Sequence, residues 1–443
     1  MKIIIIGAQA AGASAAAKAK RKDPNATIRI YEKSDIVSFG ACGLPYFIGN
    51  HFQDENEMIS RTPNQFAKDG IEIKTLHEVI AIDAKLKKIT VKDLNTNNCF
   101  DDDYDKLLIA VGAVPIIPPL ENRQLENIFT LRDIYDGLAI KSALANPQNT
   151  NVVVIGAGYI GLEVTESLVE LNKNVKLIQL DDRVLVDAFD PELTEIIEEN
   201  LKQHCDLHLQ ERVQGFEGVQ TVTHVITDKA KYAADIVIIA TGVKPNSEVY
   251  KDLDIETLNN GAIIIDNYGQ TNIAGVYAAG DCVALYHRVS QSMTYIPLAT
   301  GANKLGKTVG DNLAGGNNQF PGTLGTSALK VFDIEAGRTG LTESQTIKAG
   351  IPYKTVIVKD KNHSNYVEGQ TGVIAKLIYH AETRILLGGQ IAGGNGAALR
   401  TNSLATAIWA NMKIDELAMM DFLYAPPFSR PWDILNIAGG IAK

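Results

Sequence analysis

The sequence predicts an α/β protein in which two parallel-strand units of the same kind are followed by a C-terminal α+β domain. A strand, a Gly-rich turn, a helix and a strand follow one another over residues 2–32, and the same order returns over residues 151–179. From about Thr323 the segments alternate in polarity and are followed by helices, which is typical of an antiparallel sheet with helices on one face. A length of 443 residues, with 45% hydrophobic and 21% charged residues, fits about three domains.

The first unit has the pattern of a dinucleotide-binding βαβ unit. Its turn, Gly7–Gly12, precedes an Ala-rich helix, and its second strand ends at Glu32. The glycines would let the helix approach the strand, a pyrophosphate would bind at the helix N-terminus, and Glu32 would accept a hydrogen bond from a ribose hydroxyl. Because Gln9 occupies the second glycine position, this unit alone also fits an ordinary α/β helix start.

The stretch Ser38–Tyr46, just beyond the first unit, carries Cys42 between small residues. A planar ring could therefore approach the Cys42 sulfur closely, which makes this cysteine the candidate for redox chemistry. The alternative at this point is a small buried hydrophobe, the usual role of a free cysteine.

Alternating strands follow, at Ile71–Lys74, Val79–Ile82 and Lys88–Val91. Their alternation predicts an antiparallel, half-exposed sheet inserted after the first unit. The run Leu107–Ala113 then predicts a parallel strand that ends in a small-residue turn. Prolines over residues 115–119 mark a crossing between domains.

The second unit repeats the pattern with a complete GxGxxG motif. Strand Val152–Ile155 leads into the turn Gly156–Gly161, a helix follows, and the next strand is Val175–Ile178. This context predicts a second dinucleotide site. Gln179 stands where a carboxylate would favour a free 2′-hydroxyl, and Arg183 lies a few residues on, so the choice between NADH and NADPH stays open.

Later segments are predicted to provide further strand ends and a helix, part of which lies at the first dinucleotide site. The strand end Val237–Gly242 repeats the small-residue pattern, and Gly275–Asp281 brings a carboxylate to another strand end, where it could hold a ribityl hydroxyl of a flavin. Cys282 is interpreted as structural. Pro297–Gly310 predicts a helix that closes over the same site.

The third domain is predicted from four alternating segments and two helices. The chain then continues into Phe422–Ser429, an apolar and aromatic segment whose prolines exclude a helix and whose surface is typical of docking. The predicted strands are Ala328–Phe332, Lys354–Val358, Gly372–Tyr379 and Ile385–Ile391, and the predicted helices are Ala397–Trp409 and one that starts near Ile414.

Composition excludes several classes of protein. The formal net charge of −10 argues against a nucleic-acid binder. The apolar run Ile3–Ile6 is too short for a signal peptide, and no run is long enough to span a membrane. The cysteines are too scattered for a metal site and too few for a disulfide scaffold, so we expect an unanchored cytoplasmic protein. The four are Cys42, Cys99, Cys205 and Cys282.

Together, the two dinucleotide units, the cysteine after the first and the C-terminal α+β domain resemble the flavin-dependent pyridine nucleotide disulfide oxidoreductases over essentially the whole chain. Members that carry an internal disulfide have a second cysteine at the position of Phe47 in this sequence. The resemblance therefore implies the single-cysteine branch, which contains NADH oxidases, NADH peroxidases and coenzyme A disulfide reductases.

Three local features bear on the choice within that branch. Oxidases and peroxidases have a histidine that supports a cysteine sulfenic acid, and here that position is Ala10. The run Cys42–Tyr46 is similar to the coenzyme A disulfide reductase form. Tyr366 and Tyr424 match the contexts of two tyrosines that assist those reductases from the partner subunit, although both could instead be interface residues with satisfied hydroxyls.

The resemblance implies two Rossmann-like domains and a dimer. We expect a discontinuous FAD-binding domain at 1–114 and 244–322, an NAD(P)-binding domain at 115–243 and a C-terminal dimerisation domain at 323–443. The expected FAD residues are Gly7, Ala8, Gly12, Glu32, Lys33, Ser38, Val79, Ala110, Gly112, Gly280, Asp281, Pro297 and Ala299. The expected NAD(P) residues are Gly156, Gly158, Tyr159, Ile160, Gly161, Glu163, Gln179 and Gly242.

The implied reaction is reduction of coenzyme A disulfide through a mixed disulfide on Cys42, whose pKa would need to be lowered, with Tyr424 as proton donor and Tyr366 in support. Two alternatives stay open: an NADH oxidase or peroxidase that forms a sulfenic acid, and a non-catalytic flavoprotein redox sensor. Coenzyme A carries phosphates and needs a cationic patch, although part of that patch could equally be an ordinary solvated helix face. The expected substrate residues are Arg21, Lys22, Ser38 and Arg61.

Overall fold

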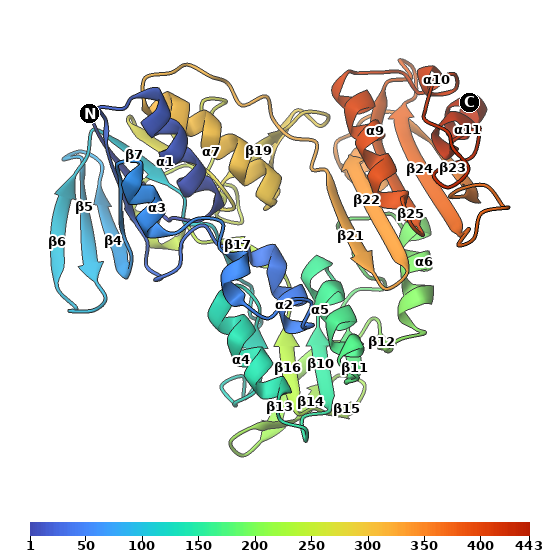
Figure 1. Cartoon of the computed structure of the whole chain (residues 1–443), viewed down its shortest axis with the longest axis horizontal. Coiled ribbons are helices and arrows are strands. Elements are labelled where there is room, and N and C mark those ends of the chain that lie inside the picture. Colours follow the sequence, from blue (N-terminus) through green and yellow to red (C-terminus); the bar gives the residue numbers. More distant parts are fainter.

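The computed structural model describes residues 1–443 and divides into three sheet-based regions (Figure 1). The first is a parallel five-stranded sheet in the order β18-β7-β1-β2-β3, in which Ile5 pairs with both Ile30 and Leu108. Its central strand β1 is almost wholly buried, as its run of isoleucines predicts. The strands are β1 Lys2–Ile6, β2 Thr27–Tyr31, β3 Ile71–Lys74, β7 Lys106–Ile109 and β18 Val276–Ala278.

The prediction for Ile71–Lys74 is wrong in its pairing. This segment, β3, joins the parallel sheet beside β2, with Ile28 opposite Ile71 and Ile30 opposite Ile73. It is an edge strand with one exposed face, so it alternates in polarity just as a half-exposed antiparallel strand does. The inserted antiparallel sheet instead contains β4 His77–Asp83, β5 Lys88–Asp93 and β6 Cys99–Asp103.

Two helices pack closely against each other beside the first sheet. Helix α1 spans Ala10–Lys22 and α7 spans Ala299–Leu313, so the helix expected at Pro297–Gly310 starts and ends later than predicted. Small residues make the approach possible: a Cβ on Gly306 would lie 2.5 Å from the Ala11 carbonyl oxygen. The approach places both helices along one wall of the site described below.

The second region repeats the first. Its parallel sheet has the order β12-β11-β10-β16-β9, with Ile155 opposite both Ile178 and Ile239. A small antiparallel sheet, β13-β14-β15, flanks it and was not predicted. The elements are β9 Ile128–Thr130, α4 Ile134–Leu144, β10 Asn151–Ile155, α5 Tyr159–Glu170, β11 Asn174–Ile178, α6 Pro191–Leu201, β12 Asp206–His208, β13 Val213–Gly218, β14 Val222–Thr227, β15 Lys231–Ala233 and β16 Ile236–Ile239.

Short elements connect the regions. An antiparallel pair, β8 and β17, lies between the first two regions, and the hairpin β19-β20 precedes α7. These elements are η1 Ala41–Gly43, α2 Leu44–Ile48, η2 Glu55–Met58, α3 Pro63–Lys68, β8 Ala113–Pro115, β17 Val243–Pro245, η3 Glu248–Leu253, β19 Ala284–His287 and β20 Ser292–Tyr295.

The third region, coloured orange to red in Figure 1, is an antiparallel sheet in the order β21-β22-β25-β24-β23 with α9 packed against β22 and β25. The predicted strands and helices are present, and the second strand, β22, was not predicted. The elements are β21 Ser327–Val331, β22 Ile334–Gly340, α8 Glu343–Lys348, β23 Tyr353–Lys361, β24 Gly372–His380, β25 Leu386–Gly393, α9 Ala397–Trp409, α10 Ile414–Leu417 and α11 Ile434–Ile441. Within the described residues no helix has both the length and the apolar character needed to cross a membrane.

Candidate active site

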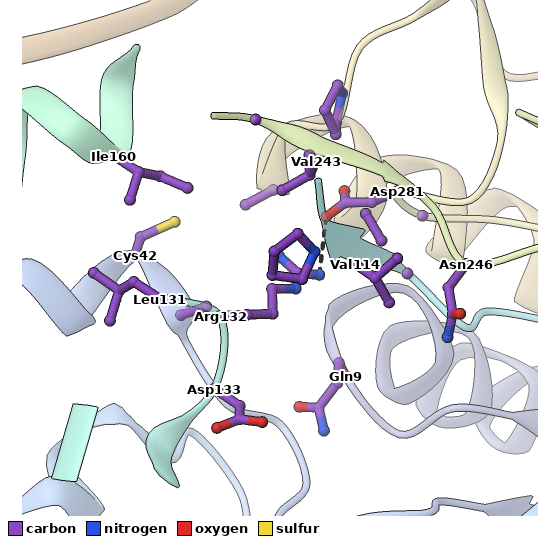
Figure 2. A pocket seen from close by; sticks show the side chains of 18 of the residues that line it. Gln9, Cys42, Val114, Leu131, Arg132, Asp133, Ile160, Val243, Asn246 and Asp281 are labelled. Carbon is purple, nitrogen blue, oxygen red and sulfur yellow. Dashed lines mark hydrogen bonds and ion pairs between the residues drawn. The ribbon is translucent and has the colours of Figure 1, made fainter. Parts of the chain in front are cut away.

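A cavity of about 1730 Å³ lies where the two Gly-rich turns face the segment that carries Cys42. Figure 2 shows the part of it around Cys42, with Ile160, Arg132 and Asp281 contributed by other segments. Its wall takes in residues from Ile6 to Ala328, so it joins groups that lie far apart in the sequence. This volume exceeds that of an ordinary single-ligand site.

The first Gly-rich turn meets the geometric demands of a nucleotide site. Gly7 has a φ of +100°, and a Cβ on Gly12 would lie 1.9 Å from the Gly7 carbonyl oxygen, so α1 starts directly against the strand end. Glu32 accepts a hydrogen bond from the Ala8 amide at 2.8 Å and others from the Ser34 amide and hydroxyl at 3.0 and 2.9 Å. The turn, the helix N-terminus and the carboxylate therefore lie together, as a bound dinucleotide requires.

An unsatisfied buried group also fits a flavin. The Tyr295 hydroxyl is buried at the cavity wall without a hydrogen-bond partner among the described residues, and such groups normally have one. Of the expected FAD residues, Ala8 and Gly12 lie behind the lining. The others line the cavity: Gly7, Glu32, Lys33, Ser38, Val79, Ala110, Gly112, Gly280, Asp281, Pro297 and Ala299.

The second Gly-rich turn has nearly the same backbone. Gly156 has a φ of +103°, and a Cβ on Gly161 would lie 1.9 Å from the Gly156 carbonyl oxygen. A Cβ on Gly158 would meet no described atom within 4 Å, which leaves room for a close ligand. Of the expected NAD(P) residues, Gly161 lies behind the lining and the others line the same cavity: Gly156, Gly158, Tyr159, Ile160, Glu163, Gln179 and Gly242.

Cys42 lies in η1, just before α2, and its thiol is exposed to the cavity. The surrounding protein raises its pKa, chiefly by displacing water, and the Glu163 and Asp281 carboxylates add to the rise while Arg132 opposes it. The protein chain alone therefore does not lower the pKa of Cys42, chiefly because it displaces water from the thiol. Glu163 is itself perturbed: burial, with Glu166 close by, raises its pKa to about 7.

Comparison with known families agrees with this geometry. The model of the pyridine nucleotide-disulphide oxidoreductases matches residues 1–306, and the model of the dimerisation domain of the same family matches residues 326–434. The chain belongs to the pyridine nucleotide-disulphide oxidoreductase family. It is an oxidoreductase of mixed α/β fold, and FAD and a pyridine nucleotide are the cofactors of the family.

Relatives within this family have several names. The chain is 38% identical over 443 residues to the CoA-dependent NAD(P)H sulfur oxidoreductase of Pyrococcus furiosus, covering 100% of this chain and 99% of the relative. It is 33% identical to the coenzyme A disulfide reductase of Staphylococcus haemolyticus, covering 100% and 99%. The solved structure of the water-forming NADH oxidase of Lactobacillus brevis bound to NADH superposes with a TM-score of 0.95 at 31% identity, covering 99% and 98%.

One residue of this oxidoreductase site was missed by sequence reasoning. Arg132 follows β9 and points toward Asp281, with 3.5 Å between its Nη2 and the Asp281 Oδ2 (Figure 2). It is the cation that opposes the rise in the Cys42 pKa. The signal was a short strand followed by the polar pair Arg132 and Asp133, at the carboxyl end of a parallel sheet where ligands commonly bind.

The two tyrosines lie together in the third region, away from the lining around Cys42. The Tyr366 and Tyr424 hydroxyls are 3.2 Å apart, and the side chains are 71% and 46% exposed. Neither tyrosine lines the cavity of its own chain. The structure thus brings the two tyrosines to each other and does not bring them to Cys42.

Some of the expected substrate residues line the cavity and one does not. Arg21, Ser38 and Arg61 line the cavity, whereas Lys22 is exposed outside it. Arg61 is already engaged, because its guanidinium pairs with Asp69 and lies over the Phe66 ring at 4.0 Å. Arg21 therefore offers the less engaged positive charge of the two for an anionic ligand.

Proposed function

We propose that this chain reduces coenzyme A disulfide to coenzyme A with NAD(P)H, through FAD and the single redox-active residue Cys42. One observation carries the proposal: Cys42 opens onto the cavity that both Gly-rich turns share, while the position of a second thiol is filled by Phe47, 1% exposed. Within the described residues no other cysteine lines that cavity. The second sulfur of the reaction must then come from the substrate.

The chemistry follows thiol–disulfide exchange. The Cys42 thiolate attacks one sulfur of the substrate, the substrate S–S bond breaks, and one coenzyme A leaves as its thiolate while Cys42 forms a mixed disulfide with the other half. Two electrons and a proton then release the second coenzyme A and restore the Cys42 thiolate. When bound, FAD supplies this two-electron chemistry by accepting a hydride from the nicotinamide.

One wall of the cavity that holds Cys42 suits a long anionic substrate. Helices α1 and α7 line it with Ser14, Arg21, Asn303 and Lys307, and the Ser14 hydroxyl donates to the Asn303 Oδ1 at 2.8 Å. Two cations and two polar groups along one path fit a phosphate-bearing chain. The net acidity of the chain does not oppose this, because the cations are local.

Tyr424 and Tyr366 are proposed to act in a homodimer. The dimerisation domain supports such an assembly, in which the tyrosines of one chain would reach Cys42 of the partner. Their mutual hydrogen bond lowers the pKa of Tyr366 and raises the pKa of Tyr424. Tyr424 therefore keeps its proton at neutral pH, as a donor to the leaving thiolate must.

The test is Cys42→Ser with Cys99→Ser as the matched control, since Cys99 is exposed on β6 and does not line the cavity. We expect Cys42→Ser to lose reduction of coenzyme A disulfide by at least about 1,000-fold while anaerobic reduction of the flavin by NADH continues. Cys99→Ser should match the parent in both measurements. Parent-level turnover of the disulfide by Cys42→Ser would disprove the proposal.

An NADH oxidase is the second candidate, favoured by the TM-score of 0.95 to the Lactobacillus brevis enzyme. Ala10 argues against it, because this residue lines the cavity where a histidine would support a sulfenic acid. Oxygen consumption per NADH, compared with thiol release per NADH, distinguishes the two functions. We also propose a reducing cytoplasmic setting, because all four cysteines are free.

A further inference from the structure

The end of strand β11 carries an arrangement that the GxGxxG motif alone does not predict. Gln179 follows the last residue of the strand and is 9% exposed. Its Oε1 accepts a hydrogen bond from the Ala157 amide at 2.8 Å, and its Nε2 donates to the Asp181 Oδ2 at 2.7 Å. The neutral amide thus occupies the position expected for a carboxylate and holds a carboxylate two residues further along.

The backbone fixes Asp181 as well. The Gln210 amide donates to the Asp181 carbonyl oxygen at 2.9 Å, and the Glu211 amide donates to the Gln179 carbonyl oxygen at 3.0 Å. Asp181 is therefore held through both its backbone and one carboxylate oxygen, while its side chain is exposed on the cavity lining. A polar group held in this way is pre-organised, so little entropy is lost when it binds a ligand.

The charges at this end of the cavity favour a ribose with a free 2′-hydroxyl over one that carries a 2′-phosphate. Residues 178–213 contribute three carboxylates to the lining, from Asp181, Asp187 and Glu211, and one guanidinium, from Arg212. The nearby Arg183 lies outside the lining, because it donates to the Val186 carbonyl oxygen at 2.9 Å and pairs with Asp182 at 3.5 Å. A 2′-phosphate would meet an excess of negative charge here.

We propose that Asp181 makes this chain select NADH over NADPH, and that Gln179 is the positioning residue that holds the Asp181 carboxylate. The free 2′-hydroxyl of NADH donates a hydrogen bond to that carboxylate, whereas the 2′-phosphate of NADPH is repelled by it. This proposal rests on the nucleotide site of the proposed function and names the nucleotide that the site prefers. It requires no assumption about the disulfide substrate.

The experiment measures binding and flavin reduction separately, so that it does not depend on the acceptor. Isothermal titration of the purified holoenzyme with ADP-ribose and with 2′-phospho-ADP-ribose gives the ratio of the two dissociation constants. We expect the parent to favour ADP-ribose by about 10- to 100-fold, the range typical of a hydrogen bond to a charged group. Anaerobic stopped-flow reduction of the flavin by NADH and by NADPH should give the same ratio in apparent affinity.

Three variants define the roles. Asp181→Asn keeps the shape, removes the charge and should lower the ratio about tenfold or more, mainly by improving the binding of the phosphorylated ligand. Gln179→Ala should lower it by a smaller factor through weaker ADP-ribose binding, and in flavin reduction it should change the apparent affinity for NADH more than the rate constant at saturation. Glu195→Gln, an exposed change of one charge on α6 outside the cavity, should leave the ratio alone.

Two outcomes would overturn the inference: equal affinity of the parent for the two ligands, or an unchanged ratio in Asp181→Asn. Asp181→Glu guards against an unrelated effect of the asparagine, because it retains the charge and should retain most of the preference. Failure of coenzyme A disulfide turnover alone would contradict the proposed function and leave these binding ratios standing.

Discussion

The two nucleotide units have nearly the same backbone, and they differ in the side chains at the end of the second strand and in the Gly-rich turn. In the first unit the strand end carries a carboxylate, Glu32, which accepts from Ser34 two residues on. In the second unit it carries an amide, Gln179, which donates to Asp181 two residues on. The charge has moved by two residues and the hydrogen bond has reversed, so a shared fold leaves room for different ligands at each site.

The two Gly-rich turns also differ, at the position that Gln9 occupies in the first unit. Gln9 donates to the Ile36 carbonyl oxygen at 2.8 Å and accepts from the Phe39 amide at 2.9 Å, which ties the first turn to the segment that leads to Cys42. The equivalent residue in the second unit is Gly158, whose missing side chain leaves open space. The first turn is thus tied to the segment that carries Cys42, whereas the second turn keeps open space at the equivalent position.

The largest effects should come from adding a methyl group to the glycine at which the helix of each unit packs against its Gly-rich turn. Gly12→Ala and Gly161→Ala each place a Cβ 1.9 Å from a backbone oxygen, so each must push its helix away from its turn. We expect Gly12→Ala to be purified with little flavin, as measured by flavin absorbance per protein. Gly161→Ala should keep its flavin and show an apparent affinity for NADH weakened about 100-fold.

Each glycine variant is the control for the other. If Gly161→Ala lost flavin as completely as Gly12→Ala, or if both bound NADH like the parent, the assignment of one cofactor to each unit would be wrong. Circular dichroism of the two proteins separates a lost site from a lost fold.

An intermediate effect should follow from removing the hydrogen bonds by which Gln9 ties the first turn to the segment that carries Cys42. Gln9→Ala removes two hydrogen bonds to the Cys42 segment, about 2 kcal/mol in total. We expect disulfide turnover to fall about tenfold, with flavin reduction by NADH within about twofold of the parent. Gln203→Ala, an exposed glutamine on the surface, should change neither rate. Equal losses in both half-reactions would mean that Gln9 supports the flavin site as a whole.

Sequence reasoning succeeded where structure follows from local pattern. Both Gly-rich turns and the strands around them are defined by residues close in sequence, and their cavity-facing positions could be listed in advance. It failed where a buried charge interrupts the pattern. Strand β22 contains Arg338, 7% exposed, whose terminal guanidinium nitrogens donate to the Ala188 and Gly340 carbonyl oxygens, partners that come into reach only after folding.

The same limit applies to the site. Arg132 acquires its role from Asp281, almost 150 residues away, and the Tyr366–Tyr424 contact depends on the packing of two loops. Asp181 lies off the motif position by two residues and is recognisable only through the Gln179 side chain. Such pairings depend on side-chain geometry, which periodicity does not record.

The smallest effect should come from Glu163, a position on α5 that corresponds to Ser14 on α1. Burial raises the pKa of Glu163 from 4.5 to about 7, so it is neutral in mildly acidic solution and charged above neutrality. When charged, it raises the pKa of Cys42. We expect Glu163→Gln to lower the Cys42 pKa by less than about one unit, measured by the pH dependence of iodoacetamide alkylation of the reduced enzyme.

The size of this effect differs between the two sides of neutrality. The parent and Glu163→Gln should react alike where Glu163 is protonated and diverge as the pH rises through about 7.

Stability gives an independent check: a pKa raised in the folded state contributes stability that is complete below 4.5 and is lost as the pH rises through about 7. The free energy of unfolding of the parent, relative to Glu163→Gln, should therefore fall across that window. Glu195→Gln, an exposed change of one charge on α6 outside the cavity lining, should show neither change, and a matching shift there would trace both effects to the net charge of the chain.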